Sequence, residues 1–239
     1  MIMIETREKF DAIYQLFSRK YPLKQTKIPL GQTEVTLFYV EDVDTLLDDL
    51  IKLGPEAEAV KDERLPYWAE LWPASIALSQ FIVENAELVS GKNALELGCG
   101  VGLTGLAAAM HGASVRISDY QPDALRISEL NWLLNLDRSP ASVLMDWRNP
   151  TIDEKFELII ASDVVYEKRF FDALIKVFHH NLKPNGQIIL SEPNRTIAVD
   201  FFKKLSREGF CFKSYPTEID RNDQTYHIKV YVIERNKPG

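Results

Sequence analysis

A strand, a glycine-rich turn and a helix follow one another without interruption, and this unit constrains the fold more than any other part of the chain. Residues Asn93–Leu97 have the apolar character of a buried strand, and Gly98, Gly100 and Gly102 come directly after it. Because glycine has no Cβ atom, the backbone of such a turn can bend sharply and come close to a ligand. The alanine-rich helix expected over Leu103–Met110 would direct its free N–H groups at that ligand. The unit therefore predicts a loop that binds a nucleotide-like cofactor.

The spacing of these glycines differs from that of the usual dinucleotide-binding loop. Glu96 stands two positions before the first glycine, so the pattern reads E-x-G-x-G-x-G, whereas pyrophosphate-binding loops read G-x-G-x-x-G. A carboxylate at this point would repel a diphosphate and attract hydroxyls or a cationic amino-acid group. The sequence thus indicates a cofactor with a positively charged end. Taken alone, a glycine turn of this kind is also compatible with a plain strand-to-helix connection.

Two further apolar runs end in acidic residues. The run 113–118 ends at Asp119, about 23 residues after Glu96, an offset at which a carboxylate accepts hydrogen bonds from ribose hydroxyls. The run 141–145 ends at Asp146 and Trp147. Asp119 would equally suit the N-cap of the helix that follows it, and the two roles are compatible. These carboxylates are expected at the carboxyl ends of neighbouring strands.

Strands and helices continue to alternate toward the C-terminus, which predicts a mostly parallel sheet with helices on both faces. The expected helices cover 123–136, 169–181 and 198–207, and the expected strands cover 156–161 and 187–191. The last two strands, 210–217 and 225–234, flank the polar stretch 218–224 and should form a hairpin. One antiparallel strand would then belong to an otherwise parallel sheet.

With these motifs, the chain from Leu65 onward resembles the class I methyltransferases, whose Rossmann-like α/β sheet has seven strands and whose cofactor is S-adenosylmethionine. The resemblance implies that Glu96 and the backbone of Gly98, Gly100 and Gly102 face the methionine part of the cofactor. It implies that Asp119 faces the ribose, that Asp146 and Trp147 face the adenine, and that S-adenosylhomocysteine is the product. Trp72, Tyr120 and Ser162 are assigned to cofactor binding on the same grounds.

An aromatic loop precedes the cofactor strand. Tyr67, Trp68 and Trp72 lie within residues 65–74, between two prolines, and a helix is expected from Ser75. The two tryptophans could serve as core anchors, because a buried indole removes a large apolar area from water. Alternatively, the rings line the cofactor pocket, where aromatic faces suit a sulfonium or a substrate amine.

The expected catalytic residues follow the fourth strand of the sheet. Asp163 and Tyr166 come directly after its end, where ligands bind in open α/β sheets, and should face the transferred methyl group. Methyl transfer from a sulfonium mainly requires an aligned, desolvated nucleophile. Asp163 could orient an amine, although a carboxylate also favours the ammonium form. The alternative is that Asp163 caps a turn and Tyr166 packs beneath it. The segment Ser191-Glu192-Pro193-Asn194-Arg195, after the fifth strand, could supply another wall of the crevice, with Glu192 as the residue to test.

The aromatic loop, the Asp146-Trp147 pair and the Asp163-Val-Val-Tyr166 motif together narrow the resemblance. They are similar to those of the protein lysine methyltransferases, the subgroup that includes the enzyme for the electron-transfer flavoprotein β-subunit. This implies methyl transfer to a lysine amine of a protein. The alternatives are a small-molecule N- or O-methyltransferase and a non-catalytic binding module of the same fold. The Asn/Asp-Pro-Pro-Tyr/Phe motif of adenine and glutamine N-methyltransferases is absent from this strand end.

Residues 1–64 should form an extension before the cofactor-binding domain of residues 65–239. Its sequence predicts a helix over 7–19, strands over 26–30 and 34–40, and a helix over 43–53, followed by a linker at 60–66. The extension carries no catalytic motif. It is expected to act as a lid or to select the substrate.

The net charge and the cysteine content indicate which partners and which cellular compartment to expect. A formal net charge of −7 disfavours nucleic acid as a partner, since such binding relies on neutralising phosphates. Two cysteines and four histidines show neither a disulfide framework nor metal-ligand spacing, so no metal is expected. The N-terminus reaches charge too soon for a signal segment, and no apolar run is long enough to span a membrane. We therefore expect a cytoplasmic protein without a membrane partner.

Overall fold

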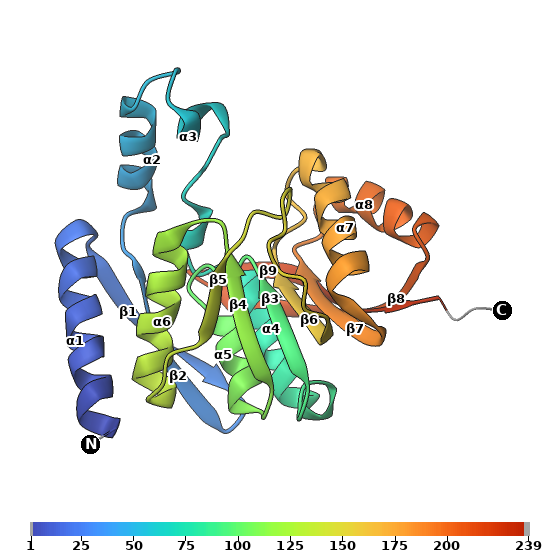
Figure 1. The fold of residues 1–239 in the computed structure, drawn as a ribbon, viewed down its shortest axis with the longest axis horizontal. Helices are drawn as coiled ribbons and strands as arrows, with labels where there is room; N and C mark the ends of the chain where they lie inside the picture. Colours follow the sequence, from blue (N-terminus) through green and yellow to red (C-terminus); the bar gives the residue numbers. More distant parts are fainter. Residues whose placement is uncertain (1, 237–239) are drawn as a thin grey trace.

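The computed structural model describes residues 2–236 and has a central sheet of seven strands (Figure 1). The strand order is β5-β4-β3-β6-β7-β9-β8, in which β9 alone runs antiparallel to the rest. This confirms the predicted α/β sheet with one antiparallel strand in a C-terminal hairpin. The strands are β3 (Asn93–Leu97), β4 (Ser114–Asp119), β5 (Ala141–Leu144), β6 (Phe156–Ser162), β7 (Leu182–Glu192), β8 (Phe210–Arg221) and β9 (Gln224–Arg235).

The strand order also shows where a ligand can bind. The chain runs outward from β3 through β4 to β5 and then returns to β6 on the other side of β3. In open α/β sheets, such a reversal leaves a crevice between the two inner strands at their carboxyl ends. The crevice should therefore lie above β3 and β6.

Helices cover both faces of the sheet because side chains alternate between the faces along each strand. In β3, Ala94 packs into the core on one face, whereas Leu95 and Leu97 pack into the core on the other. The first face carries α4 (Pro73–Glu84), α5 (Leu103–Met110) and α6 (Pro122–Leu136), and the second carries α7 (Phe171–Asn181) and α8 (Thr196–Arg207). Short 3-10 helices lie at Tyr67–Ala69, Ala86–Leu88 and Lys168–Phe170.

The N-terminal segment begins with α1 (Ile2–Lys20) and the hairpin of β1 (Leu23–Leu30) and β2 (Thr33–Val40), which lie along α6 (Figure 1). Two asparagines of α6 are four residues apart and therefore share one helix face. The side-chain amide of Asn131 accepts from Phe38 N–H (2.7 Å) and donates to Phe38 C=O (3.0 Å). Asn135 makes the same pair of bonds to Thr36 (3.1 and 2.8 Å). Helix α6 thereby provides hydrogen-bond partners for the backbone N–H and C=O groups of Thr36 and Phe38 in the edge strand β2.

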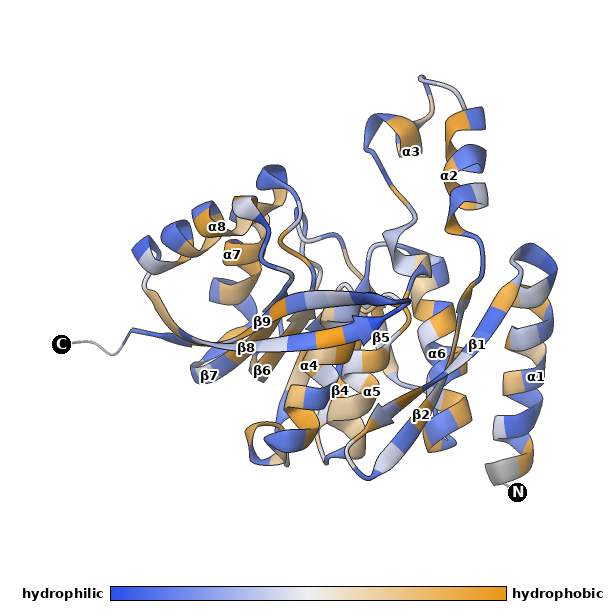
Figure 2. Ribbon diagram, turned by 180° about the vertical axis from the view of Figure 1, so that it is seen from behind, coloured by the Kyte–Doolittle hydropathy of each residue, from blue (hydrophilic) through white to orange (hydrophobic). Residues whose placement is uncertain are grey.

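An acidic arm, residues 41–64, projects from the rest of the molecule and contains α2 (Val43–Lys52) and α3 (Glu58–Lys61) (Figure 1). Neither helix has a buried residue. The arm has nine acidic and three basic side chains, so it carries −6 of the formal net charge of −7. Hydrophobic and hydrophilic residues alternate along α2 (Figure 2), and Ile51 is 63% exposed.

Two of the expected boundaries differ from the structure. The linker expected over 60–66 contains the end of the short helix α3. The hairpin turn expected over 218–224 is only Asn222 and Asp223, because β8 and β9 remain paired as far as Arg221 and Gln224. Both turn residues have positive φ (52° and 59°), which a two-residue turn between twisted strands requires and which Asn and Asp tolerate. The polar residues before the turn belong to an exposed edge strand.

Within residues 2–236, no helix combines the length and the hydrophobicity needed to cross a membrane. Cys99 is buried and Cys211 is exposed, and both are free thiols.

Candidate functional site

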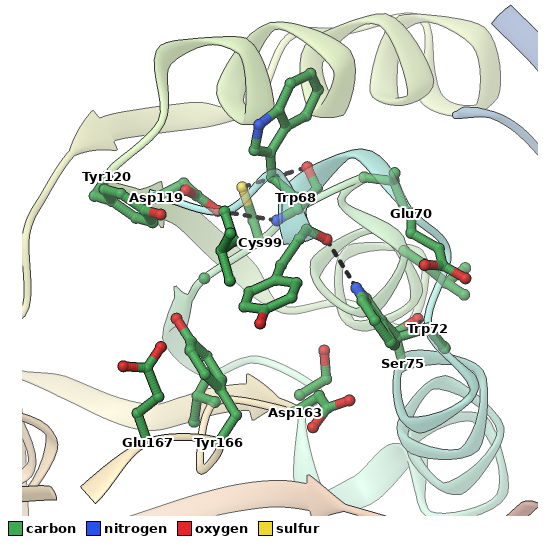
Figure 3. A pocket seen from close by; sticks show the side chains of 18 of the residues that line it. Trp68, Glu70, Trp72, Ser75, Cys99, Asp119, Tyr120, Asp163, Tyr166 and Glu167 are labelled. Atoms are coloured by element: carbon green, nitrogen blue, oxygen red, sulfur yellow. Dashed lines mark hydrogen bonds between the residues drawn. The ribbon is translucent and has the colours of Figure 1, made fainter. Parts of the chain in front are cut away.

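A cavity of about 380 Å³ lies at the carboxyl ends of β3, β4 and β6, at the position expected from the strand order (Figure 3). Its volume is in the range of pockets that bind small ligands. Aromatic and carboxylate side chains from several elements converge on it (Figure 3). The predicted site residues among its lining are Trp72, Gly98, Gly100, Asp119, Tyr120, Trp147, Ser162, Asp163 and Tyr166.

The glycine turn forms one wall of the cavity in a backbone conformation that other residues rarely adopt. Gly98, Gly100 and Gly102 all have positive φ, at 64°, 50° and 82°. A Cβ atom on Gly102 would lie 2.6 Å from the hydroxyl oxygen of Ser128 in α6. Gly102 itself does not line the cavity; it lets α5 begin close against α6. Its predicted contact with the cofactor remains a prediction.

Asp119 is the last residue of β4 and holds the glycine turn in place. One carboxylate oxygen accepts Gly100 N–H (3.1 Å), and the other accepts Gln121 N–H (3.0 Å). Helix α6 starts after Gln121, so Asp119 orders the segment before the helix and is not its N-cap. Burial raises the pKa of Asp119 from 3.8 to about 6. Each oxygen retains a lone pair that can accept a ligand hydroxyl.

Glu96 lies away from the cavity, contrary to its predicted position. Side chains alternate along β3, and Glu96 points toward α5, where its Oε1 accepts Gly105 N–H (2.9 Å). Its Oε2 is buried and has no hydrogen-bond partner among the described residues. Burial raises the pKa of Glu96 to about 8, so the carboxyl group is largely protonated at neutral pH. Glu96 therefore supports the first turn of α5 rather than facing a ligand.

Gly105→Ala should destabilise the protein because Glu96 occupies the space that a methyl group needs. A Cβ on Gly105 would lie 2.2 Å from Glu96 Oε2. In an open helix this substitution stabilises by about 1 kcal/mol, but here we expect the free energy of unfolding to fall by about 2 kcal/mol. Urea denaturation measures the change. Glu96→Ala in the same chain should recover part of the loss, and an equal loss in both proteins would contradict the explanation.

Asp146 also lies outside the cavity, in an adjoining small hollow beside Trp147. Its carboxylate pairs with Arg148 (2.6 Å), and the same guanidinium binds Asp62 of the acidic arm (2.8 Å). The Arg148 guanidinium holds the pKa of Asp62 well below its usual range. Asp146 thus fastens the arm to the loop after β5. Of Asp146 and Trp147, which were both expected to face the adenine, only Trp147 lines the cavity, and its ring lies against Gly98.

The aromatic loop serves both of the purposes considered for it. Trp68 is 9% exposed and packs edge-on against Tyr21 of the N-terminal segment (5.6 Å between centroids), yet it also lines the cavity. Trp72 belongs to the cavity wall, and its Nε1 donates to the carbonyl of Tyr67 (2.8 Å). The Tyr67 ring packs edge-on against Tyr166 (5.3 Å). These rings enclose the side of the cavity that faces Asp163.

Asp163 and Tyr166 both line the cavity; Asp163 lies across it from Asp119, and Tyr166 lies on the wall below Tyr120 (Figure 3). The backbone of Asp163 has φ of 56°, and its N–H donates to the carbonyl of Ser191 (2.9 Å). Its carboxylate does not cap a turn; it accepts two hydrogen bonds from the guanidinium of Arg195. Burial raises the pKa of the Tyr166 phenol far above its ordinary value, so the phenol is neutral at physiological pH.

Within the segment 191–195, which was expected to supply a wall of the crevice, Arg195 rather than Glu192 lines the cavity. Glu192, the candidate in that segment, is 1% exposed and lies behind the wall, where it accepts Arg195 N–H (2.7 Å). A signal was present, because a buried carboxylate such as Asp163 requires a cationic partner and Arg195 follows the neighbouring strand end. Other lining residues outside the prediction include Glu70, Ser75, Cys99 and Glu167.

The cavity carries a surplus of acidic groups. Its ionisable carboxyls are Glu70, Asp119, Asp163 and Glu167, and Arg195 is the one basic residue among the described lining residues. An acidic, partly aromatic wall suits a cationic ligand. No group of side chains within residues 2–236 is arranged to hold a metal ion.

Comparisons with known proteins agree with this geometry. The model of a family described as lysine methyltransferase matches residues 58–208. The electron transfer flavoprotein beta subunit lysine methyltransferase of Mus musculus is 36% identical over 132 residues, which are 54% of this chain and 51% of that protein. The chain thus spans about half the length of this relative.

A second relative is matched over more of its length. The protein N-lysine methyltransferase METTL21A of Danio rerio is 30% identical over 193 residues, 73% of this chain and 81% of that protein. Among solved structures, ribosomal protein L11 methylase from Lactobacillus delbrueckii subsp. bulgaricus has a TM-score of 0.55 at 22% identity, over 68% of this chain and 79% of that one. That structural likeness concerns the fold alone.

Proposed function

The chain belongs to the lysine methyltransferase family, and from this premise we propose that it transfers a methyl group from S-adenosylmethionine to a lysine side-chain amine of a protein. The observation that carries the proposal is one cavity with two different ends. Asp119 and the glycine turn form one end, Asp163 lies at the other, and Tyr166 lies on the wall between them. A cofactor and an acceptor group can meet between them.

The residues present fit S-adenosylmethionine. Gly98 and Gly100 line the cavity with their backbone, and the lack of a Cβ on Gly98 leaves room for the Trp147 ring, which would be 3.1 Å from that atom. Asp119 offers free lone pairs for hydroxyls, and the acidic lining matches a ligand with a sulfonium and an ammonium group. When bound, S-adenosylmethionine supplies an activated methyl group. Trp147 and Tyr120 would then flank the base and the ribose.

The opposite end of the cavity has groups that can hold an amine. Asp163 can accept an amine N–H, and the rings of Tyr67, Trp72 and Tyr166 can exclude water from the nucleophile. The Tyr166 phenol is neutral and strongly resists deprotonation, so it contributes a ring and a hydroxyl rather than a base. The chain therefore acts by alignment and desolvation.

We propose further that the acidic arm faces the acceptor protein. Lysine-bearing protein surfaces are often basic, and the arm carries −6 of formal charge and leads directly into Leu65 and Tyr67 of the cavity wall. Opposite charges speed encounter, and salt screens that attraction. Methyl transfer to the acceptor should therefore slow as ionic strength rises at low acceptor concentration.

The function can be tested before the acceptor protein is identified. Calorimetry measures S-adenosylmethionine binding to the purified protein. Tritium-labelled S-adenosylmethionine is then added with lysate of cells that lack the gene for this chain. We expect one or few labelled protein bands whose hydrolysate contains methyllysine. Label in small molecules alone would favour a small-molecule acceptor, and a folded protein that binds no cofactor would favour a binding module.

A further inference from the structure

Arg195 and Asp163 form a charge pair inside the wall of the cavity. Both Nη atoms of Arg195 donate to the two carboxylate oxygens of Asp163, with Nη2 and Oδ2 3.2 Å apart. The Asp163 side chain is 9% exposed and that of Arg195 is 31% exposed. A fork-shaped contact of this kind fixes the orientation of the carboxylate as well as its charge.

Backbone and side-chain contacts hold both partners in position. Asp163 has a left-handed backbone conformation and donates its N–H to Ser191 at the end of β7. Arg195 donates its own N–H to the buried carboxylate of Glu192, whose Oε1 also lies 4.0 Å from the guanidinium. The ends of β6 and β7 are thus joined through one pair of charges.

The carboxylate of Asp163 has two opposing effects on a lysine acceptor: it can orient the amine, but it also favours the unreactive ammonium form. A free lysine has a pKa near 10.4, and its ammonium must lose a proton to solvent before the nitrogen lone pair can react. An unpaired carboxylate beside the amine would stabilise the ammonium and oppose this step. Asp163 without a partner would therefore position the acceptor in its unreactive form.

We propose that Arg195 is a positioning residue that cancels the charge of Asp163, so that the pair orients the acceptor amine without holding it as an ammonium ion. This inference rests on the proposed lysine methyltransferase function. It assigns to Arg195 a role that acts through Asp163 and through the electrostatic field at the acceptor end.

The other ionisable groups around the cavity do not replace this cation. Glu70 comes from the aromatic loop, Glu167 and Tyr166 from the segment after β6, and Tyr67 from the 3-10 helix beside them. Asp119, Tyr120 and Cys99 lie toward the cofactor end, and Glu192 lies behind Arg195. All of them are acidic or neutral. Arg169 pairs with Glu167 (2.5 Å), and Arg221 lies near Glu70. Among the described residues, Asp163 forms its ion pair with Arg195, so loss of Arg195 would leave Asp163 as an uncompensated carboxylate beside the acceptor amine.

The pH dependence of methyl transfer tests the proposal. Tritium incorporation into the most strongly labelled lysate protein is measured between pH 6.5 and 10 for wild type, Arg195→Met and Arg195→Lys. With Arg195→Met we expect the alkaline rise of the rate to move to higher pH, with about a tenfold loss at pH 7.5 for each unit of increase in the amine pKa. The rate should approach that of wild type near pH 10. Arg195→Lys retains the cation and should keep the wild-type profile with a raised KM for the acceptor.

A stability measurement and a binding measurement accompany the kinetics. S-adenosylmethionine affinity by calorimetry should be nearly the same in all three proteins, which shows that each variant is folded. Thermal unfolding of Arg195→Met, Asp163→Asn and the double variant should show coupling between the two substitutions. A uniform loss of rate at every pH in Arg195→Met, or additive effects on unfolding, would overturn the inference. Failure of the proposed function would appear differently, as wild-type protein that labels no lysine.

Discussion

Asp119→Ala is expected to lower the affinity for S-adenosylmethionine by about 100-fold. The substitution removes an acceptor for ligand hydroxyls and releases the Gly100 and Gln121 N–H groups that shape the turn. A hydrogen bond to a charged group contributes about 1.5–3 kcal/mol, and about 1.4 kcal/mol corresponds to a tenfold change in affinity. Two such bonds account for the expected loss. Isothermal titration calorimetry at pH 7.5 measures it directly.

The pH dependence of the same affinity distinguishes the carboxylate from a merely structural residue. The pKa of Asp119 is raised to about 6 by burial, so the group is ionised at pH 7.5 and protonated well below pH 6. Protonation replaces an acceptor by a donor, and wild-type affinity should fall as pH decreases from 7 to 5. Asp119→Asn should bind weakly and show a flat profile over this range. Wild-type affinity that is unchanged at pH 5 would contradict ligand contact by this carboxylate.

The raised pKa values of Asp119 and Glu96 also have a consequence for stability, which provides a control. A carboxyl group whose pKa is higher in the folded state favours folding most when it is protonated. For Asp119 this contribution disappears as pH rises from about 4 to about 6, and for Glu96 as pH rises from about 4.5 to about 8. Weak binding at pH 5 would therefore not result from loss of these two contributions to folding.

The fold and the part of the cavity formed by the glycine turn and Asp119 could be predicted because their signals are local. The strand, the glycine turn and the start of α5 are contiguous in sequence, and glycine is required there by backbone conformation. Asp119 follows an apolar run that has the length of one strand. The position of the C-terminal hairpin was predicted for the same reason, although its turn was expected to be longer than two residues.

The remaining parts of the site depend on contacts between distant residues. The direction of Glu96 depends on which face of the sheet α5 covers, and strand periodicity alone leaves that choice open. Asp146 pairs with Arg148, whose guanidinium also binds Asp62, 86 residues away in sequence. Arg195 reaches Asp163 from the next strand end, 32 residues away. The sequence shows that these side chains are ionisable, but it does not show which of them form ion pairs with one another.

The N-terminal segment shows the same limit. Its helices and strands were expected, yet Asn131 and Asn135, which fasten β2 to α6, looked like ordinary polar residues of a helix. Tyr21 and Phe17 pack against Trp68 of the cavity wall, so the segment shares the core of the sheet domain. Its predicted role as a lid or a substrate-selecting element remains a prediction.

Asp163→Asn is expected to reduce the turnover of methyl transfer by about 100-fold while the protein still binds S-adenosylmethionine. Asparagine has nearly the same shape, but its amide cannot pair with Arg195 as a carboxylate does, and the orientation of the acceptor is lost. Misplaced reacting groups typically cost about two orders of magnitude in rate. Because Asp163 lies at the end of the cavity opposite Asp119, cofactor affinity should change by only about threefold.

Single-turnover labelling of the acceptor, with cofactor affinity measured in parallel, separates the two effects. Asp172→Asn is a matched control, because Asp172 is an exposed acid of α7 that pairs with Lys204 and does not line the cavity. This control should retain wild-type turnover. If Asp163→Asn did so as well, Asp163 would be a structural partner of Arg195 and the acceptor would be oriented by Tyr166 and the aromatic rings. If Asp163→Asn lost cofactor affinity and turnover together, the two ends of the cavity would not be separate sites, and the geometry on which the proposed function rests would have to be revised.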